Sequence, residues 1–162
     1  MYKLIFTAMS ILMGLGAFSQ PQPPSSRDGA ALRQQQFNAP DGIGIKGYDP
    51  VAYFTTGKAV EGSKEYTVTL DGATYRFASA QNRDAFKSTP SKYQPQFGGW
   101  CAYAMGSSGE KVEIDPQTFK ILNGKLYLFY NKFFNNTLKS WNKDEVNLKP
   151  KADANWTKLN NK

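Results

Sequence analysis

The sequence predicts an α+β domain in which two β-hairpins build an antiparallel sheet and helices pack on one face of that sheet. The pairs Asp71-Gly72 and Asn123-Gly124 each separate two runs in which apolar and polar residues alternate. An Asx-Gly pair between such runs is typical of a two-residue type I′ turn. Segments with helical features lie between the hairpins and after the second one, so helices and antiparallel strands share one domain.

The strands are predicted from the alternation itself. The first hairpin is expected over residues 66–70 and 73–77, and the second over residues 118–122 and 125–130. Side chains on a strand point to opposite faces in turn, so alternating runs indicate strands with one buried face. Together the two hairpins predict at least four antiparallel strands.

Two short helices are predicted in the first half of the domain. Asp49-Pro50 supplies a capping residue followed by a proline at the first helical position, which predicts a turn of helix through Tyr53. Ser79 can cap a second helix over residues 81–87, with Phe86 facing the sheet.

The last third of the chain predicts two further helices. Asn131 is the expected cap of a helix from Lys132 to about Val146, and residues 152–159 are expected to form a last short helix that docks Trp156. The residues at helical spacing in the longer helix are Phe133, Phe134, Leu138, Trp141 and Glu145. This spacing assigns the aromatic residues to the core rather than to a ligand site.

The ends of the chain indicate three regions. Residues 1–19 have the pattern of a signal peptide: Lys3 is followed by an uncharged, mostly apolar stretch from Leu4 to Phe18, and small residues at positions 17 and 19 favour cleavage before Gln20. The stretch is shorter than the roughly 20 residues of a membrane span. Residues 20–40 form a linker rich in Gln, Pro and Ser, and residues 41–160 form one domain. We therefore expect an extracytoplasmic protein, periplasmic or secreted.

The amino-acid composition excludes the most common catalytic and zinc sites. The chain has no histidine and a single cysteine, so it cannot build a Ser-His-Asp or Cys-His catalytic set or a usual zinc site. Its net charge is +7, but acidic residues are interspersed among the lysines of the last third, which is typical of a solvated helix face. We expect no nucleic-acid partner and no stable membrane insertion after signal cleavage, and the oligomeric state stays open.

Cys101 is the centre of the candidate site. It follows Gly98-Gly99, whose backbone can take positive φ or approach a ligand closely. Cys101 and Met105 would be a soft donor pair suited to Cu(I) if the segment is helical. Trp100 and Tyr103 offer aromatic surface to a small ligand. The sequence singles out no catalytic residue, and it predicts a binding module for copper or a small ligand.

Two alternatives stay open for the same thiol. A thiol-dependent enzyme or redox protein would need the pKa of Cys101 to be lowered by a helix N-terminus or a nearby cation. A structural or interaction protein of the envelope would instead bury Cys101 as a small apolar side chain. Solvent exposure of the sulfur distinguishes these hypotheses.

Several segments together resemble the YHS domain, in particular its exported branch. They are Gly47-Tyr48-Asp49-Pro50-Val51-Ala52-Tyr53-Phe54, Tyr75-Arg76-Phe77-Ala78-Ser79, Asn82-Arg83-Asp84-Ala85-Phe86, Pro90-Ser91-Lys92-Tyr93, Gly99-Trp100-Cys101-Ala102, the Asn-Gly-Lys-Leu-Tyr-Leu hairpin and the Ala152–Trp156 ending. The resemblance covers nearly everything from Ile43 to Trp156.

The resemblance implies a distant similarity to TRASH-type cysteine modules, which are associated with heavy metals, copper among them. The thiols of those modules correspond to Ala52, Ala78 and Asn82 in this chain, so all three are missing. The metal site of the modules is therefore not carried over. Any soft-metal binding here would depend on Cys101.

Overall fold

Both predicted hairpins form. In the computed structural model, which describes residues 36–161, β1 (Ser63–Leu70) pairs with β2 (Ala73–Phe77) and β3 (Asp115–Leu122) pairs with β4 (Lys125–Phe129). The turn residues Asp71 and Asn123 have φ of 52° and 51° and are followed by glycines that also have positive φ. The α+β class and the two Asx-Gly turns are thus confirmed.

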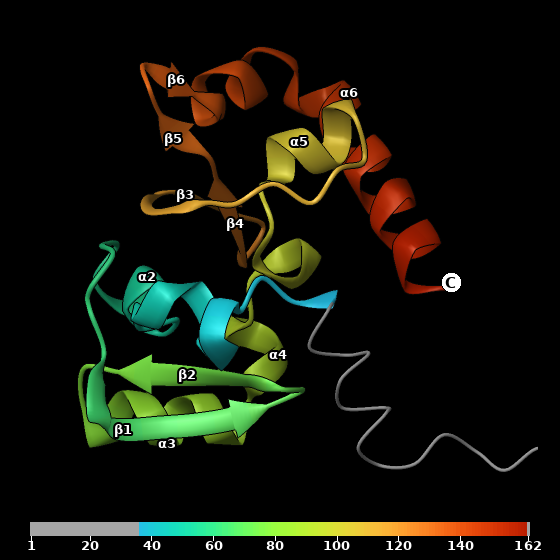
Figure 1. Ribbon diagram of the computed structural model, residues 1–162. Helices are drawn as coiled ribbons and strands as arrows, with labels where there is room; N and C mark the ends of the chain where they lie inside the picture. Colours follow the sequence, from blue (N-terminus) through green and yellow to red (C-terminus); the bar gives the residue numbers. More distant parts are fainter. Residues whose placement is uncertain (1–35, 162) are drawn as a thin grey trace, which may run out of the picture.

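The hairpins do not join in one sheet. The described strands form separate two-stranded sheets, the third being the pair β5 (Asn131–Lys132) and β6 (Asn135–Asn136) (Figure 1). Other segments bridge to the two hairpins instead: Ile43 forms a parallel bridge with Thr74 of β2, and Pro95 forms one with Leu126 of β4. Both faces of β4 are buried. Leu126 and Leu128 point into one core cluster, whereas Tyr127 and Phe129 point into another. Strand β4 therefore lies between the two core clusters and packs against both of them.

The first half of the fold follows its local signals closely. Its short elements after residue 39 are η1 (Pro40–Gly42), η2 (Gly44–Gly47), α2 (Ala52–Thr55), α3 (Ala80–Ser88) and α4 (Pro90–Tyr93). The Ser79 hydroxyl accepts a hydrogen bond from the Asn82 N–H at 3.1 Å and caps α3 as predicted. Phe86 is fully buried, and its ring centroid lies 5.0 Å from that of Tyr75.

The second half contains η3 (Gln96–Gly99), α5 (Ala102–Ser107) and the long helix α6 (Thr137–Asn160). The predicted start of this helix is wrong. Asn136, not Asn131, is the N-cap, and its Oδ1 accepts a hydrogen bond from the Leu138 N–H at 3.1 Å. The two helices predicted over residues 132–146 and 152–159 are one element with a kink at Asp144.

The assignment of Phe133 and Phe134 to the core is also wrong. Both residues form the tip of the β5–β6 hairpin, and their exposed fractions are 88% and 111%. The helical spacing that included them is correct only from Leu138 and Trp141 onward, since Trp141 is fully buried between Tyr127 and Phe129.

The folded domain extends further toward the N-terminus than the predicted boundary at residue 41. The Asn38 N–H donates to the Gly98 carbonyl at 2.8 Å, and the Asn38 side-chain amide donates to the Gly99 carbonyl at 3.0 Å. Residues 36–40 therefore belong to the domain. The predicted signal peptide and residues 20–35 of the predicted linker lie outside the described residues.

No helix within residues 36–161 combines the length and the apolar character that crossing a bilayer requires.

Candidate functional site

Cys101 occupies the N-cap position of α5, at the boundary between the two core clusters. Gly98 and Gly99 have φ of 60° and 85°, and this left-handed pair turns the chain into the segment that leads to α5. The Cys101 N–H then donates to the Val112 carbonyl at 2.9 Å. The side chain has an exposed fraction of zero.

The buried thiol is held by hydrogen bonds on both sides. Its sulfur accepts from the Tyr130 N–H at 3.3 Å and lies 3.4 Å from the Thr137 hydroxyl. The Thr137 hydroxyl gives its single proton to the Tyr130 carbonyl at 2.8 Å. It follows that the Cys101 S–H donates to Thr137, so the geometry suits a protonated thiol used as donor and acceptor at once.

A cleft of about 440 Å³ lies above this thiol. It is lined by Cys101, Tyr103, Ala104, Ser107, Ser108, Glu110, Val112, Tyr130, Asn135 and Thr137. Cys101 and Ala104 are buried members of this lining, Val112 adds partly buried apolar surface, and Ser107 and Ser108 are exposed. Among the lining residues Glu110 is the one carboxylate, and none is a lysine or arginine. The cleft therefore suits a neutral or cationic ligand better than an anion.

The structure places only part of the predicted site in this cleft. Tyr103 lines it together with Cys101, whereas Trp100 and Met105 do not. The indole N–H of Trp100 donates to the Gln36 carbonyl at 2.8 Å. The Met105 N–H donates to the Cys101 carbonyl at 3.0 Å, so the two residues are one helical turn apart, as the copper prediction requires.

The side chains of that sulfur pair belong to different packed clusters. Cys101 packs with the cluster that contains Phe86, and Met105 packs with the cluster that contains Trp141. Within residues 36–161, no three His, Cys, Asp or Glu side chains gather as a metal site would require. The Cys101/Met105 copper site stays a prediction.

A buried carboxylate that sequence reasoning treated only as a cap organises the first half. Asp49 is fully buried. Its Oδ1 accepts from the Val51 N–H at 2.8 Å and the Ala52 N–H at 3.3 Å. Its Oδ2 accepts from the Ala78 N–H at 2.8 Å and the Asn82 side chain at 2.7 Å. Ala52, Ala78 and Asn82 thus meet around one carboxylate, and all three present N–H donors to it.

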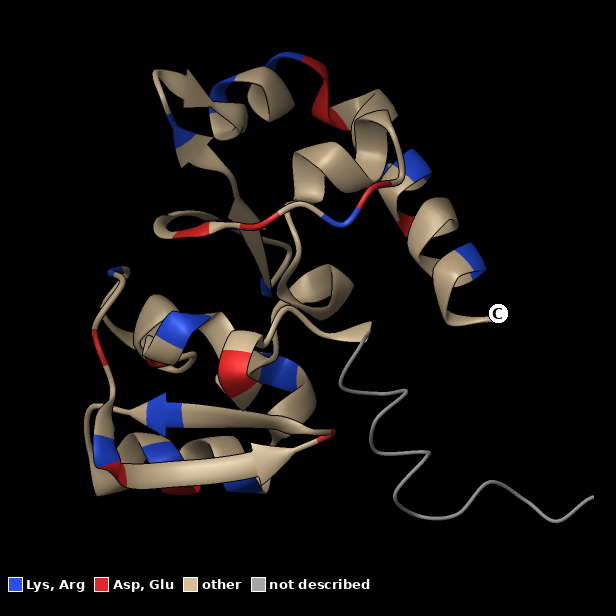
Figure 2. Cartoon of the chain, viewed as in Figure 1, with Lys and Arg blue, Asp and Glu red and all other residues tan. Residues whose placement is uncertain are grey.

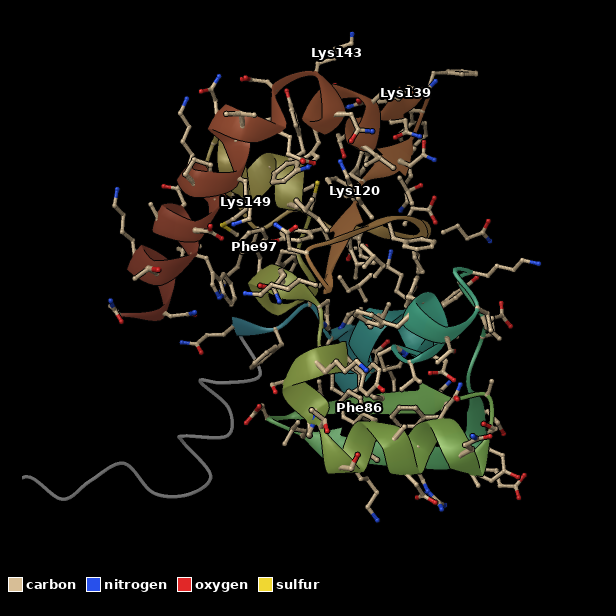
Figure 3. All side chains as sticks on the ribbon, turned by 180° about the vertical axis from the view of Figure 1, so that it is seen from behind. Phe86, Phe97, Lys120, Lys139, Lys143 and Lys149 are labelled. Atoms are coloured by element: carbon tan, nitrogen blue, oxygen red, sulfur yellow. The ribbon has the colours of Figure 1, made fainter. Side chains whose placement is uncertain are left out.

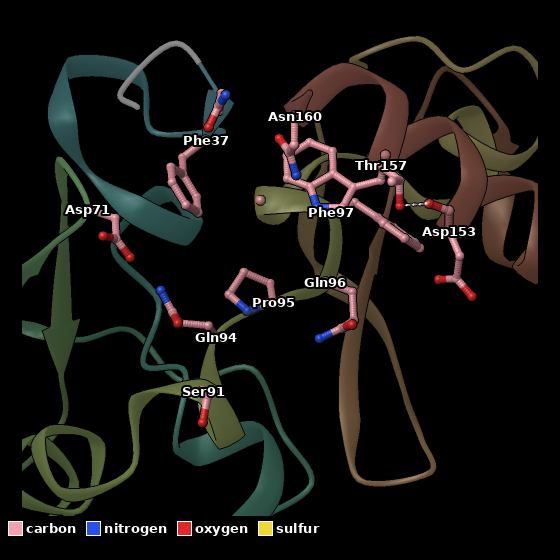
Figure 4. Close-up of a pocket in the computed structure, with 13 residues that line it drawn as sticks. Phe37, Asp71, Ser91, Gln94, Pro95, Gln96, Phe97, Asp153, Thr157 and Asn160 are labelled. Carbon is pink, nitrogen blue, oxygen red and sulfur yellow. Dashed lines mark hydrogen bonds between the residues drawn. The ribbon is translucent and has the colours of Figure 1, made fainter. Parts of the chain in front are cut away.

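A second cleft, of about 400 Å³, lies between the two halves of the fold (Figure 4). It is lined by Gln36, Phe37, Asp71, Ser91, Gln94, Pro95, Gln96, Phe97, Gly98, Asp153, Trp156, Thr157 and Asn160. Aromatic rings, amides and two carboxylates face it, with no lysine or arginine among them. Sequence reasoning missed this cleft, because it is assembled from four separated stretches and none carries a recognisable motif.

Comparisons of the chain with protein-family models, with curated proteins and with solved structures find no match. The resemblance to the YHS domain therefore stays a prediction, and the site has to be interpreted from its own geometry.

Proposed function

We propose that this protein is a non-catalytic binding module that takes a small organic ligand in the cleft above Cys101. The observation that carries the proposal is the cleft itself. Its volume of about 440 Å³ lies within the roughly 300–1,000 Å³ of small-molecule sites. Like such sites, it combines apolar and aromatic walls with a few polar groups.

The lining indicates the class of ligand. Tyr103 and Tyr130 supply aromatic surface, and Glu110 supplies a carboxylate at the rim. Aromatic faces and a carboxylate together favour a cation such as a quaternary ammonium group, whereas aromatic faces alone favour a neutral aromatic molecule. An anionic ligand would find no positive charge among the lining residues.

The thiol supports binding rather than catalysis. A cysteine nucleophile reacts as the thiolate and needs access to its substrate. Cys101 is fully buried, its proton is directed at Thr137, and the chain has no histidine to act as its base. We therefore assign Cys101 to the floor of the cleft, where it packs under the ligand without bonding to it.

Choline and phenol are suitable probes of the cationic and the neutral aromatic class. We expect a saturable change of amide chemical shifts around Tyr103 and Tyr130 when the ¹⁵N-labelled protein is titrated with one of these probes. A protein that shows no saturable change with either probe would contradict the proposal.

A matched pair of variants localises the binding. Ser107 and Ser88 are the last residues of α5 and α3, and each hydroxyl donates to the carbonyl of an alanine three residues earlier. Ser107→Trp places an indole at the rim of the cleft and is expected to abolish the titration. Ser88→Trp lies outside the cleft and is expected to leave it unchanged. Equal binding in both variants would locate the ligand elsewhere.

Copper is tested separately, by titrating Cu(I) against a competing chelator with the wild-type protein and with Cys101→Ser. Because the sulfur is already hydrogen-bonded and buried, we expect the same weak competition from both proteins. A clear loss of Cu(I) affinity in Cys101→Ser would favour the copper site over the organic ligand.

A further inference from the structure

The hairpin β5–β6 has a tip that the fold itself does not explain. Its two strands pair Asn131 with Asn136 and Lys132 with Asn135, so Phe133 and Phe134 are the two turn residues. Both have positive φ, 52° and 64°. The other two hairpins use Asp-Gly and Asn-Gly for the same turn. Phenylalanine is unfavourable in this left-handed conformation, so these two residues destabilise the turn.

Neither aromatic ring contributes to the packing of the folded protein. Their exposed fractions of 88% and 111% mean that neither packs against the body of the molecule. A strained turn that displays apolar side chains to solvent is expected where those side chains contact something outside the chain.

Three lysines lie at the same end of the molecule as this tip (Figure 2). Lys132 lies in β5, and Lys139 and Lys143 lie in the first turns of α6, which begins directly after β6. Figure 2 shows basic segments on β5 and at the start of α6, at the same end of the molecule. Lys139 and Lys143 project outward there in Figure 3. Within residues 36–161, none of these three lysines takes part in an ion pair of 4 Å or less.

Two of the carboxylates near this end pair with lysines, whereas Asp144, next to Lys143, accepts a hydrogen bond from the Asn147 amide, and Glu110 lines a cleft together with Asn135. Glu145 accepts hydrogen bonds from Lys120 and from the Trp141 indole. Lys46 forms an ion pair with Glu113 and holds the pKa of that carboxyl below its ordinary value, with a smaller contribution from Lys132. Lys132, Lys139 and Lys143 outnumber Asp144 and Glu110, so the charge at this end of the molecule is positive on balance.

We propose that the Phe133-Phe134 tip docks the protein on the surface of an anionic phospholipid bilayer. Two side chains at the end of a narrow hairpin are too small to form a stable protein interface, which buries roughly 800 Å² on each partner. They suit insertion into the headgroup region of a bilayer, where aromatic rings are buried shallowly and flanking lysines attract anionic lipids. Such docking is peripheral and reversible, and the observations behind it are separate from those behind the ligand proposed for the Cys101 cleft.

Co-flotation with lipid vesicles tests the proposal on the chain from Gln20 onward, which contains every described residue. The vesicles are phosphatidylcholine alone or phosphatidylcholine mixed with phosphatidylglycerol. We expect binding to the mixed vesicles at low salt, little binding to phosphatidylcholine alone, and weaker binding as salt is added. Wild-type protein that does not bind the mixed vesicles would overturn the proposal.

The decisive variant is Phe133→Asn/Phe134→Gly, because it installs the turn that the other hairpins use and so preserves the fold. It is expected to lower the partition coefficient at least tenfold. Ile121→Thr, at the end of another hairpin, is the control for losing an exposed apolar side chain and should bind as the wild type does. Equal binding by the wild type and the double variant would overturn the proposal.

Charge is tested in the same way. Lys132→Gln/Lys139→Gln/Lys143→Gln is expected to weaken binding about a hundredfold, because each lysine near an anionic surface contributes about fivefold. The control variant carries three substitutions of exposed lysines in the first half: Lys58→Gln, Lys64→Gln and Lys87→Gln. An equal loss in both triple variants would indicate attraction by net charge without docking of the tip. Self-association that disappears in the Phe133→Asn/Phe134→Gly variant, seen by sedimentation velocity, would assign the tip to a second copy instead of a bilayer.

Discussion

Replacing Asp49 with alanine is expected to lower the free energy of unfolding by about 3 kcal/mol. The carboxylate is fully buried and receives four hydrogen bonds, from Val51, Ala52, Ala78 and Asn82. The Val51 and Ala52 N–H groups are both buried and would lose their partner, which costs about 2 kcal/mol together because the Ala52 bond is long. The groups on Ala78 and Asn82 are partly exposed and can regain water, so they add about 0.5 kcal/mol each.

Urea denaturation followed by tryptophan fluorescence measures this change. Asp49→Asn is also expected to lower the free energy of unfolding. The asparagine amide keeps only one oxygen, so its own N–H groups would face some of the N–H donors that now bind the carboxylate. Asp84→Asn is the control: Asp84 is an exposed carboxylate on α3, and its replacement should leave the midpoint unchanged. A loss below about 1 kcal/mol for Asp49→Ala would refute the reasoning, since that is the size of an average substitution.

Three further outcomes are expected. Phe133→Asn/Phe134→Gly should raise stability by about 1–2 kcal/mol, because it removes two left-handed phenylalanines; thermal unfolding checks this. Native Cys101 should react with iodoacetamide no faster than the protein unfolds, and prompt labelling in native buffer would contradict its burial. Burial raises the pKa of Tyr75 to about 12, above the unfolded value near 10. Its contribution to stability should therefore be complete below pH 10 and lost as pH rises toward 12. Tyr75→Phe should flatten that decline in alkaline urea titrations, and an unchanged slope would contradict this assignment.

The parts of the fold that could be predicted are those with local causes. Asp71-Gly72 and Asn123-Gly124 determine turns within four residues, and Ser79 caps α3 through a neighbour three residues away. Each of these signals acts within one turn or one hairpin. These signals do not depend on tertiary packing, and the structure confirms both turns and the Ser79 cap.

The failures arise where two local signals compete. Asn131 and Asn136 can both cap a helix, and Phe133 and Phe134 fit the helical spacing that leads to Trp141. The chain forms a hairpin over residues 131–136 before α6 begins. A turn without glycine gives no sequence signal for that hairpin. The single predicted sheet is wrong for a different reason: no signal within either hairpin says that Ile43 and Pro95, rather than the other hairpin, bridge to β2 and β4.

The site shows the same division between local and distant causes. The single cysteine and the absence of histidine directed attention to Cys101 from composition alone, and the burial of its sulfur depends on Tyr130 and Thr137, which lie 29 and 36 residues away. Those distant segments also connect the two proposals, because two residues of the cleft lining adjoin the hairpin: Asn135 directly follows the tip, and Thr137 directly follows β6. If the tip docks on a bilayer, the Asn135 side of the cleft lies close to the headgroups. Ser107→Trp closes the cleft without altering the tip, whereas Phe133→Asn/Phe134→Gly removes the tip without altering the residues that line the cleft. A protein in which either substitution abolishes both binding events would have one coupled site rather than two adjacent ones.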